Sequence, residues 1–272
     1  MPSGRIPPVP AVLRLVQRAV LQRWRATDED LYREVAALAE AAPRMEMLVA
    51  GCGEGETTEW LAARTGATVT GVDPDAGRIA AAESRAAHAA DRSTAAVHYE
   101  LAALDDLPHE TGVFDAAVGE LSLSAAADPG RAVAELARVV KPMGAVVLMQ
   151  LTWTSEIARE ARDQVVDRLG LRPYLLVEWK QMMRDAGLVD LQVQDWTDGA
   201  PGGRASAPGA EHPHLTLRQK AHIVGRAWRR WGWRAARGAV ERETSLIREL
   251  TRQRAFGFQL MKGVKWPHAR SG

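Results

Sequence analysis

The 272-residue chain is predicted to form an α/β domain built on a doubly wound, mainly parallel sheet. Short apolar segments typical of buried strands alternate with amphipathic segments typical of helices, which predicts a parallel sheet with helices on both faces. A glycine cluster follows the first strand, where open sheets of this kind bind ligands. Hydrophobic residues make up 46% of the chain, enough for a large core, so a wholly disordered chain is excluded.

The alternation extends from residue 44 to residue 196. Its strands are expected at Met47–Ala50, Thr68–Val72, Ala96–Leu101, Phe114–Gly119, Ala145–Leu151 and Val189–Trp196. Its helices are expected at Thr57–Arg64, Asp75–Ala89, Pro129–Val140, Ser155–Leu169 and Val177–Ala186.

Three further segments flank this core. Residues 1–43 are expected to form an N-terminal helical leader, with amphipathic helices at Val12–Ala26 and Asp28–Ala41 and Thr27 as the cap of the second. Residues 197–254 combine a loop rich in Gly, Pro and Ala with a basic helical insert. Residues 255–272 comprise a last strand, Phe256–Val264, that returns to the core sheet, and a tail.

The formal net charge of +1 conceals a regional asymmetry. Residues 1–27 contain five arginines and no acid, residues 28–217 contain 16 basic and 31 acidic residues, and residues 218–272 contain 14 basic and three acidic residues. Basic ends on an acidic body indicate either an anionic partner or packing of the ends on the body.

The single cysteine, Cys52, excludes a disulfide-bonded scaffold and a Cys-rich zinc module. No metal site is expected, because the seven histidines are not grouped with cysteines or paired acids. No apolar run approaches the ~18 residues of a membrane span, and the first residues lack the pattern of a signal peptide. We therefore expect a cytoplasmic protein.

The glycine cluster reads Gly51-Cys52-Gly53-Glu54-Gly55 and directly follows the strand Met47–Ala50. Glycines at such a place let the backbone approach a ligand closely. The next strand leads into Asp73, 18 residues after Gly55. A carboxylate there can accept hydrogen bonds from both hydroxyls of an adenosine ribose.

The spacing argues against a dinucleotide site. The pattern Gly-x-Gly-x-x-Gly would need a glycine where the chain has Glu56 or, counted from Gly53, Thr58. Glu54 and Glu56 would also repel a pyrophosphate at the helix N-terminus. A cofactor with a cation and no phosphate fits better, and S-adenosylmethionine, with its sulfonium, ammonium and single carboxylate, is such a molecule.

From Met45 to Trp196 the sequence resembles the class I S-adenosylmethionine-dependent methyltransferases of the small-molecule type. The matching segments, in order, are residues 49–55, Gly71-Val72-Asp73-Pro74, Leu107-Pro108 before Phe114-Asp115, and residues 138–144 before the fifth strand. The resemblance implies a Rossmann-like fold with seven strands, the last of them antiparallel. It also implies S-adenosylmethionine as the cofactor and S-adenosylhomocysteine as the product.

The resemblance assigns cofactor contacts to particular residues. The three glycines would wrap the methionine part, Asp73 would hold the ribose, and the loop over the transferred methyl would begin at Glu120. The full implied set is Gly51, Cys52, Gly53, Gly55, Asp73, Pro74, Leu104, Asp105, Glu120 and Leu121. The chain departs from the family at Val49 and Ala103, where acids are common; Asp105 would replace the second of these acids, and the Leu104 N–H would meet the adenine ring.

Methyl transfer is an in-line displacement, so the protein mainly aligns donor and acceptor and excludes water. A hydroxyl or thiol acceptor must also lose a proton, and Glu120 is the best-placed base, with His109 as a second candidate. The alternatives are a cofactor contact or loop position for Glu120 and solvent exposure for His109. Trp153 is expected either to line the acceptor pocket or to anchor the core, and Cys52 to be a small packed residue.

The basic insert has a second pattern. Val224, Trp228, Trp231 and Ala235 recur at helical spacing, with arginines mostly on the other faces. Four interpretations stay open: a lid carrying Trp228 over the acceptor, a helix on anionic lipid, a nucleic-acid contact, and simple packing on the domain.

The expected function is therefore transfer of a methyl group from S-adenosylmethionine to a small organic acceptor. Two alternatives remain. One is a non-catalytic binding protein of the same fold, and the other is a methyltransferase acting at a membrane surface or on nucleic acid through the basic helices. Gly119-Glu120-Leu121-Ser122 lacks the element that amino-methylating nucleic-acid enzymes use, which disfavours but does not exclude a nucleic-acid substrate. The sequence leaves the oligomeric state open.

Overall fold

The computed structural model describes residues 29–89, 96–154, 159–169, 172–196, 225, 228, 232–234, 237–238, 241 and 255–267. The helix Val12–Ala26, its neighbouring cap Thr27, the loop of residues 197–213 and most of the basic insert lie outside these residues. Within the described residues, no helix is long and apolar enough to cross a membrane.

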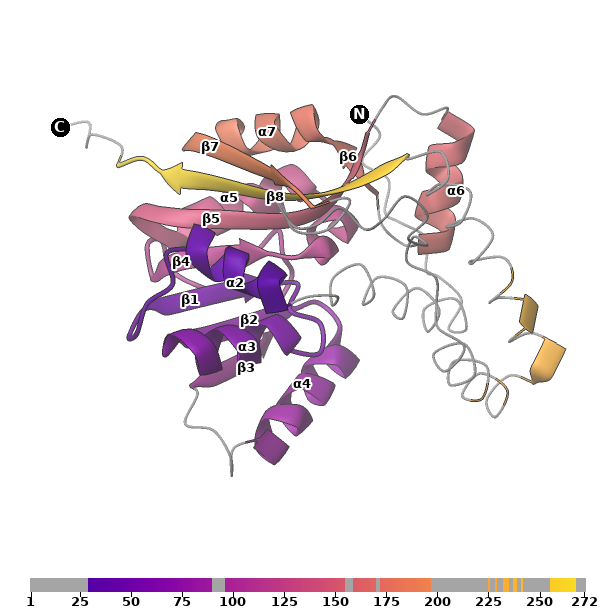
Figure 1. The fold of residues 1–272 in the computed structure, drawn as a ribbon, viewed down its shortest axis with the longest axis horizontal. Coiled ribbons are helices and arrows are strands. Elements are labelled where there is room, and N and C mark those ends of the chain that lie inside the picture. The colour runs from indigo at the N-terminus through magenta and orange to yellow at the C-terminus, as the bar shows by residue number, and fades with distance from the viewer. Residues whose placement is uncertain are drawn as a thin grey trace.

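The centre of the molecule is one twisted sheet with the strand order β3-β2-β1-β4-β5-β8-β7. The strands are β1 (Glu46–Ala50), β2 (Thr68–Asp73), β3 (Val97–Leu101), β4 (Phe114–Gly119), β5 (Val140–Trp153), β7 (Leu188–Asp195) and β8 (Phe256–Lys265). Strand β8 is antiparallel to both of its neighbours, and its arrow points the opposite way in Figure 1. The other adjacent pairs along this path are parallel. The sheet thus has the predicted doubly wound form with an antiparallel last strand.

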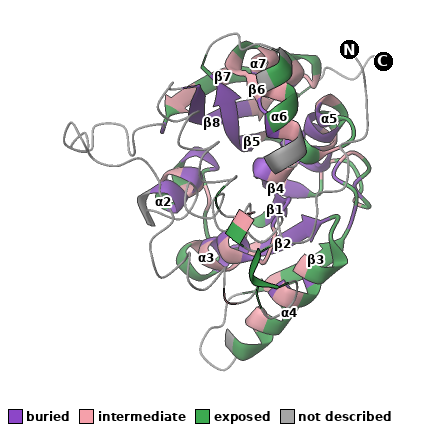
Figure 2. Ribbon diagram, turned by 90° about the vertical axis from the view of Figure 1, so that its right-hand side faces the viewer, coloured by how far each residue is buried: buried purple, intermediate pink, exposed green. Residues whose placement is uncertain are grey.

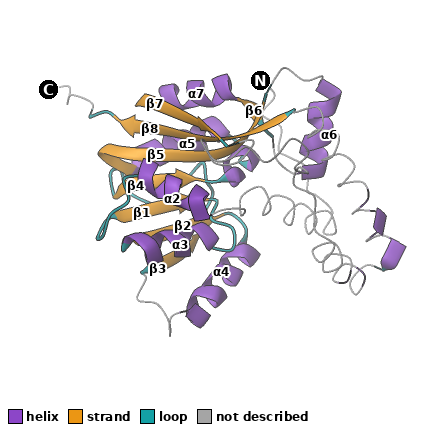
Figure 3. Cartoon of the chain, viewed as in Figure 1, coloured by secondary structure: helices purple, strands orange, loops and turns teal. Residues whose placement is uncertain are grey.

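Helices cover both faces of the sheet (Figure 3). One face packs against α2 (Glu29–Leu38), α3 (Glu56–Thr65) and α4 (Ala76–Ala89), and the other against α5 (Pro129–Val139) and α7 (Leu176–Asp185). The helix α6 (Arg159–Leu169) follows β5 and lies beyond the strand ends on the right of Figure 1. Figure 2 shows buried strands between helices that expose their outer surfaces, which is why the strands are almost continuously apolar.

Two polar contacts fasten α2 and the residues just after it to the far strands of the sheet. The Lys262 Nζ on β8 donates to Glu40 Oε1 at 2.6 Å, and the Gln194 Nε2 on β7 donates to Glu34 Oε1 at 2.6 Å. The Lys262 ammonium is largely buried, so its pairing with a carboxylate offsets the cost of removing the charge from water. The N-terminal helix is therefore part of the core layer.

The beginning of β5 differs from the sequence prediction. A helix was expected through Val140 and a strand only from Ala145, but β5 already begins at Val140. The register against β4 shifts between Phe114, which pairs with Val140, and Ala116, which pairs with Ala145. The intervening residues form a bulge in which Met143 has a φ of 68°. Proline lacks the N–H that a continued helix would need, so Pro142 favours this early end of α5.

Two short elements were not predicted. The two-residue strand β6 (Tyr174–Leu175) pairs with the end of β5 and adds an eighth strand beside the seven-stranded path. The 3-10 helix η2 (Leu121–Ala125) follows β4, where the sequence indicated only a loop. Both are too short to produce a periodic pattern in the sequence.

The bulge at Gly144 gives the first testable prediction. A Cβ on Gly144 would overlap the backbone carbonyl of Asp115, which cannot rotate away. We expect Gly144→Ala to lower the free energy of unfolding by about 1–3 kcal/mol, measured by urea denaturation. The matched control is Gly130→Ala in α5, whose Cβ would make only ordinary contacts and whose helix propensity improves. Equal stability of the two variants would contradict the assigned packing.

Candidate functional site

The candidate site lies at the carboxyl ends of β1, β2 and β4, where the strand order reverses between β1 and β4. Gly51, Gly53 and Gly55 have φ values of 76°, 58° and 86°. These left-handed conformations are accessible to glycine at little cost and strained for other residues. The Gly51 and Cys52 N–H groups both donate to the carbonyl of Val72, at 2.7 and 3.0 Å. The glycine loop is thus tied to the end of β2.

Neighbouring side chains pack directly on the glycine loop. A Cβ on Gly51 would lie 2.6 Å from the Cβ of Ser122, and one on Gly55 would overlap the Tyr99 hydroxyl. The Tyr99 hydroxyl donates to the Gly55 carbonyl at 3.3 Å. Burial, and after it the nearby Glu59 carboxylate, raises the pKa of Tyr99 well above its usual range, so the hydroxyl keeps the proton that it donates.

Asp73 is the last residue of β2, and its side chain is fully buried. Its Oδ2 accepts from the Gly53 N–H and its Oδ1 from the Asp75 N–H, each at 3.0 Å. The Arg78 Nη1 lies 3.5 Å from Oδ2. These donors offset the cost of burying a carboxylate and fix Asp73, which the sequence singled out, beside the glycine loop. Pro74, next along the chain, is exposed.

The turn after β4 is fixed to both neighbouring strands. The Glu120 N–H donates to the Ala50 carbonyl at the end of β1, at 2.9 Å. The Gln150 Nε2 on β5 donates to the Glu120 carbonyl at 2.8 Å and to the Gly119 carbonyl at 3.3 Å. Glu120 and Leu121 are both buried. The structure therefore brings Glu120 to the same sheet end as Gly51 and Asp73.

Gln150 is the residue that sequence reasoning missed. It is fully buried, and its Oε1 has no hydrogen-bond partner. The signal was present, because Gln150 is a polar residue within the apolar strand Ala145–Leu151.

The segment expected to meet adenine forms a turn after β3. The Ala102 N–H donates to the Asp73 carbonyl at 3.3 Å, and Ala103 forms a bridge with Asp106. Leu104 places its side chain in the core, whereas Ala103 is exposed and Asp105 partly exposed. The turn thus begins beside Asp73, at the same end of the sheet.

Two other candidates, His109 and Trp153, lie away from the site or serve the core. His109 packs edge-on against Phe114, the first residue of β4, with its Nε2 3.3 Å from Glu100 Oε2. It is at the opposite end of β4 from Glu120, so the structure does not join it to the site. Trp153 is buried and stacks on Phe256 with ring centroids 4.5 Å apart, which is the geometry of a core anchor.

Trp228 belongs to the insert and is exposed. Its ring lies edge-on to that of Trp233, with centroids 6.3 Å apart. Cys52 is buried in the core layer under α2 and α3, as a small packed residue would be. Among the described residues, no three His, Cys, Asp or Glu side chains lie close enough to hold a metal ion.

Comparisons with known proteins identify the family. Residues 48–148 match the family model described as a methyltransferase domain. The malonyl-[acyl-carrier protein] O-methyltransferase of Salmonella typhimurium is 35% identical over 190 residues, which cover 66% of this chain and 70% of that protein. An O-methyltransferase of Penicillium expansum is 31% identical over 121 residues, 44% of this chain and 43% of that protein.

A solved structure extends the likeness to the fold. The crystal structure of a putative sarcosine dimethylglycine methyltransferase from Galdieria sulphuraria superposes with a TM-score of 0.69 at 19% identity, over 88% of this chain and 85% of that chain. The chain belongs to the class I S-adenosylmethionine-dependent methyltransferases. Its methyl donor is S-adenosylmethionine, and its acceptor is a small molecule.

The residues present fit this donor. Gly53 is partly exposed and offers backbone without a side chain, and a Cβ at Gly51 or Gly55 would overlap Ser122 or Tyr99. The Asp73 carboxylate accepts one backbone N–H on each oxygen, and each oxygen has a further lone pair for a ribose hydroxyl.

Proposed function

We propose that the three glycines and Asp73 form the cofactor site and that the methyl group is transferred to an oxygen atom of the acceptor. The observation that carries the site assignment is the direct hydrogen bond between the Asp73 carboxylate and the Gly53 N–H at 3.0 Å. This bond holds a ribose-binding group and a methionine-binding loop in fixed relation. The oxygen acceptor is supported by the two relatives above, both named O-methyltransferases.

The donor supplies a methyl group on a positively charged sulfur. Gly51, Cys52, Gly53 and Gly55 surround its methionine part, Asp73 accepts from the ribose hydroxyls beside Pro74, and the turn with Leu104 and Asp105 faces the adenine. Leu121 and Glu120 border the methyl group. Because the displacement is in-line, these residues act mainly by fixing the donor while the acceptor oxygen approaches from the opposite side.

The acceptor oxygen decides whether a base is needed. A carboxylate acceptor is already deprotonated, whereas a hydroxyl must lose its proton as the bond to the methyl carbon forms. In the proposed mechanism for a hydroxyl acceptor, the Glu120 carboxylate takes that proton. Gln150 supports this role by holding the Glu120 carbonyl and so fixing where the residue stands.

A second surface is a further candidate. Trp228 and Trp233 are exposed side by side in the insert, and Arg234 and Arg237 nearby are exposed as well. Aromatic rings with arginines suit a peripheral contact with an anionic membrane surface. A nucleic-acid substrate is disfavoured because Gly119-Glu120-Leu121-Ser122, at the end of β4, lacks the element that amino-methylating nucleic-acid enzymes use.

The single buried cysteine suits a reducing compartment, and we propose that the protein is cytoplasmic.

The cofactor assignment predicts the effect of Asp73→Asn. This substitution keeps the shape of the side chain and removes the charge that strengthens two ribose hydrogen bonds. We expect S-adenosylhomocysteine to bind about 10-fold or more weakly, measured by isothermal titration calorimetry. Asp75→Asn is the matched control. Asp75 lies two residues after Asp73, and its carboxylate accepts hydrogen bonds from the first turn of α4, so this substitution removes a charge that does not face the proposed ribose site. Unchanged binding in Asp73→Asn would refute the ribose assignment, and no binding by the wild-type protein would refute the cofactor site.

The role of Glu120 is tested by Glu120→Gln. A radiolabelled methyl donor and a panel of small hydroxyl and carboxylate compounds first identify an acceptor, and alkaline cleavage distinguishes an ester product from an ether. For a hydroxyl acceptor we expect kcat to fall about 10²–10⁴-fold with unchanged S-adenosylhomocysteine affinity. A loss of cofactor affinity with unchanged kcat would instead show that Glu120 is a cofactor contact. With a carboxylate acceptor, we expect little change in kcat.

A further inference from the structure

The turn proposed to meet adenine belongs to a segment, residues 102–109, that has little hydrogen bonding within itself. Its internal hydrogen bond joins the Asp106 N–H to the Ala103 carbonyl at 3.4 Å, which is long for such a bond. At its start the segment is tied to Asp73 by the Ala102 N–H. Leu104 and Leu107 place their side chains in the core, but the backbone polar groups at the other end of the segment need partners of their own.

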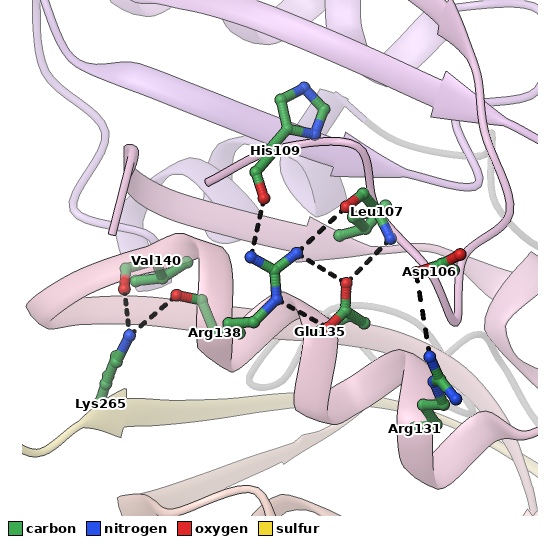
Figure 4. Close-up of polar contacts among 8 residues, drawn as sticks. All are labelled: Asp106, Leu107, His109, Arg131, Glu135, Arg138, Val140 and Lys265. Carbon is green, nitrogen blue, oxygen red and sulfur yellow. Dashed lines mark hydrogen bonds and ion pairs between the residues drawn. The ribbon is translucent and has the colours of Figure 1, made fainter. Parts of the chain in front are cut away.

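Two side chains of α5 fix that other end (Figure 4). The Arg138 Nη1 donates to the His109 carbonyl at 2.7 Å, and its Nη2 donates to the Leu107 carbonyl at 3.1 Å. The Glu135 Oε2 accepts from the Leu107 N–H at 2.9 Å. Both polar groups of the Leu107 backbone are therefore bound by side chains about 30 residues away in the sequence.

The two side chains also hold each other. The Arg138 Nε donates to Glu135 Oε1 and its Nη2 to Glu135 Oε2, both at 2.7 Å, as a bidentate pair. The hydrogen bond from Arg138 lowers the pKa of Glu135, and the one to Glu135 raises the pKa of Arg138, so both stay charged near neutral pH. The planar guanidinium makes contacts that a lysine could not reproduce together.

The backbone that carries Arg138 is fixed as well. The Lys265 Nζ at the end of β8 donates to the carbonyls of Arg138 and Val140, at 3.0 and 2.6 Å (Figure 4). These carbonyls lie at the end of α5, where no intrahelical partner is available. The Arg138–Glu135 pair that holds the segment is thus connected to the sheet through β8, which bears Lys265, and through β5, which begins at Val140.

We propose that Arg138 and Glu135 are positioning residues that set the adenine-facing turn and thereby the affinity for the methyl donor. The pair touches neither donor nor acceptor and acts through the backbone of Leu107 and His109. This inference rests on the proposed function, because it takes the turn at Leu104 and Asp105 as the adenine wall.

The central variant is Arg138→Ala, with Arg131→Ala as the matched control. Arg131 is on the same helix, but its side chain is 62% exposed, and its ion pair with the segment is 3.9 Å long and reaches the Asp106 side chain, not the backbone. Two milder variants test the same contacts if Arg138→Ala fails to fold. Arg138→Lys keeps the positive charge, and Glu135→Gln keeps an oxygen that can accept the Leu107 N–H.

The first measurement needs no ligand. Hydrogen exchange of the amides from Leu104 to Leu107 is compared with that of β1 and β2 in each variant. We expect at least 10-fold faster exchange in this turn for Arg138→Ala, an intermediate increase for Arg138→Lys, and wild-type rates in β1 and β2. Unchanged exchange in the turn would overturn the proposal whatever the protein binds.

The second measurement uses S-adenosylhomocysteine and its inosine analogue, in which a keto oxygen replaces the adenine amino group. We expect Arg138→Ala to bind S-adenosylhomocysteine about 10-fold more weakly and to lose most of the wild-type preference for adenine, while Arg131→Ala keeps both. A stability change with unchanged affinity and preference would overturn the positioning role. Absence of binding by the wild-type protein would instead refute the cofactor site, and the exchange result would still decide whether the pair fixes the turn.

Discussion

The geometry of the site depends on one buried carboxylate. Asp73 ends β2, and through its side chain and backbone it bonds the glycine loop at Gly53, the start of α4 at Asp75 and the segment after β3 at Ala102. Three loops, two of them distant from Asp73 in sequence, are therefore hydrogen-bonded to this one residue at the end of β2. A carboxylate suits this position because it accepts several N–H donors at once and is stabilised by them when removed from water. Its remaining lone pairs are the reason that the same group can serve a ligand.

The fold was largely predictable because its signals are local. The predicted strand Thr68–Val72 and the predicted helix Pro129–Val140 each end within one residue of the observed bounds. The antiparallel last strand came from the resemblance and is confirmed by its pairing with β5 and β7. The elements that were not predicted are short or irregular: β6 has two residues, and the bulge before Gly144 lets β5 begin at Val140, earlier than the predicted Ala145.

The site was predictable only in part, for a physical reason. Asp73 and the glycines stand out because their residue types are constrained by backbone geometry at the ends of strands. His109 was singled out by residue type alone, and its packing against Phe114 depends on the path of a loop that no periodicity encodes. The contacts of Arg138 and Gln150 join residues about 30 positions apart, and in the sequence each is one polar residue among many. Such groups are recognised only once the carbonyls that they bind are known.

The position of β8 between β5 and β7 has a consequence for how the chain reaches this structure during synthesis. Strand β8 follows both of its neighbours in the chain, so during synthesis β5 and β7 emerge before the strand that pairs with their facing edges. Helix α2 precedes these strands in the chain, and Glu34 of α2 and Glu40 just after it bond to β7 and β8, so these contacts form only once β8 has been made. The pairing of β8 is therefore long-range, and non-local pairing of this kind slows folding and leaves strand edges unpaired for longer.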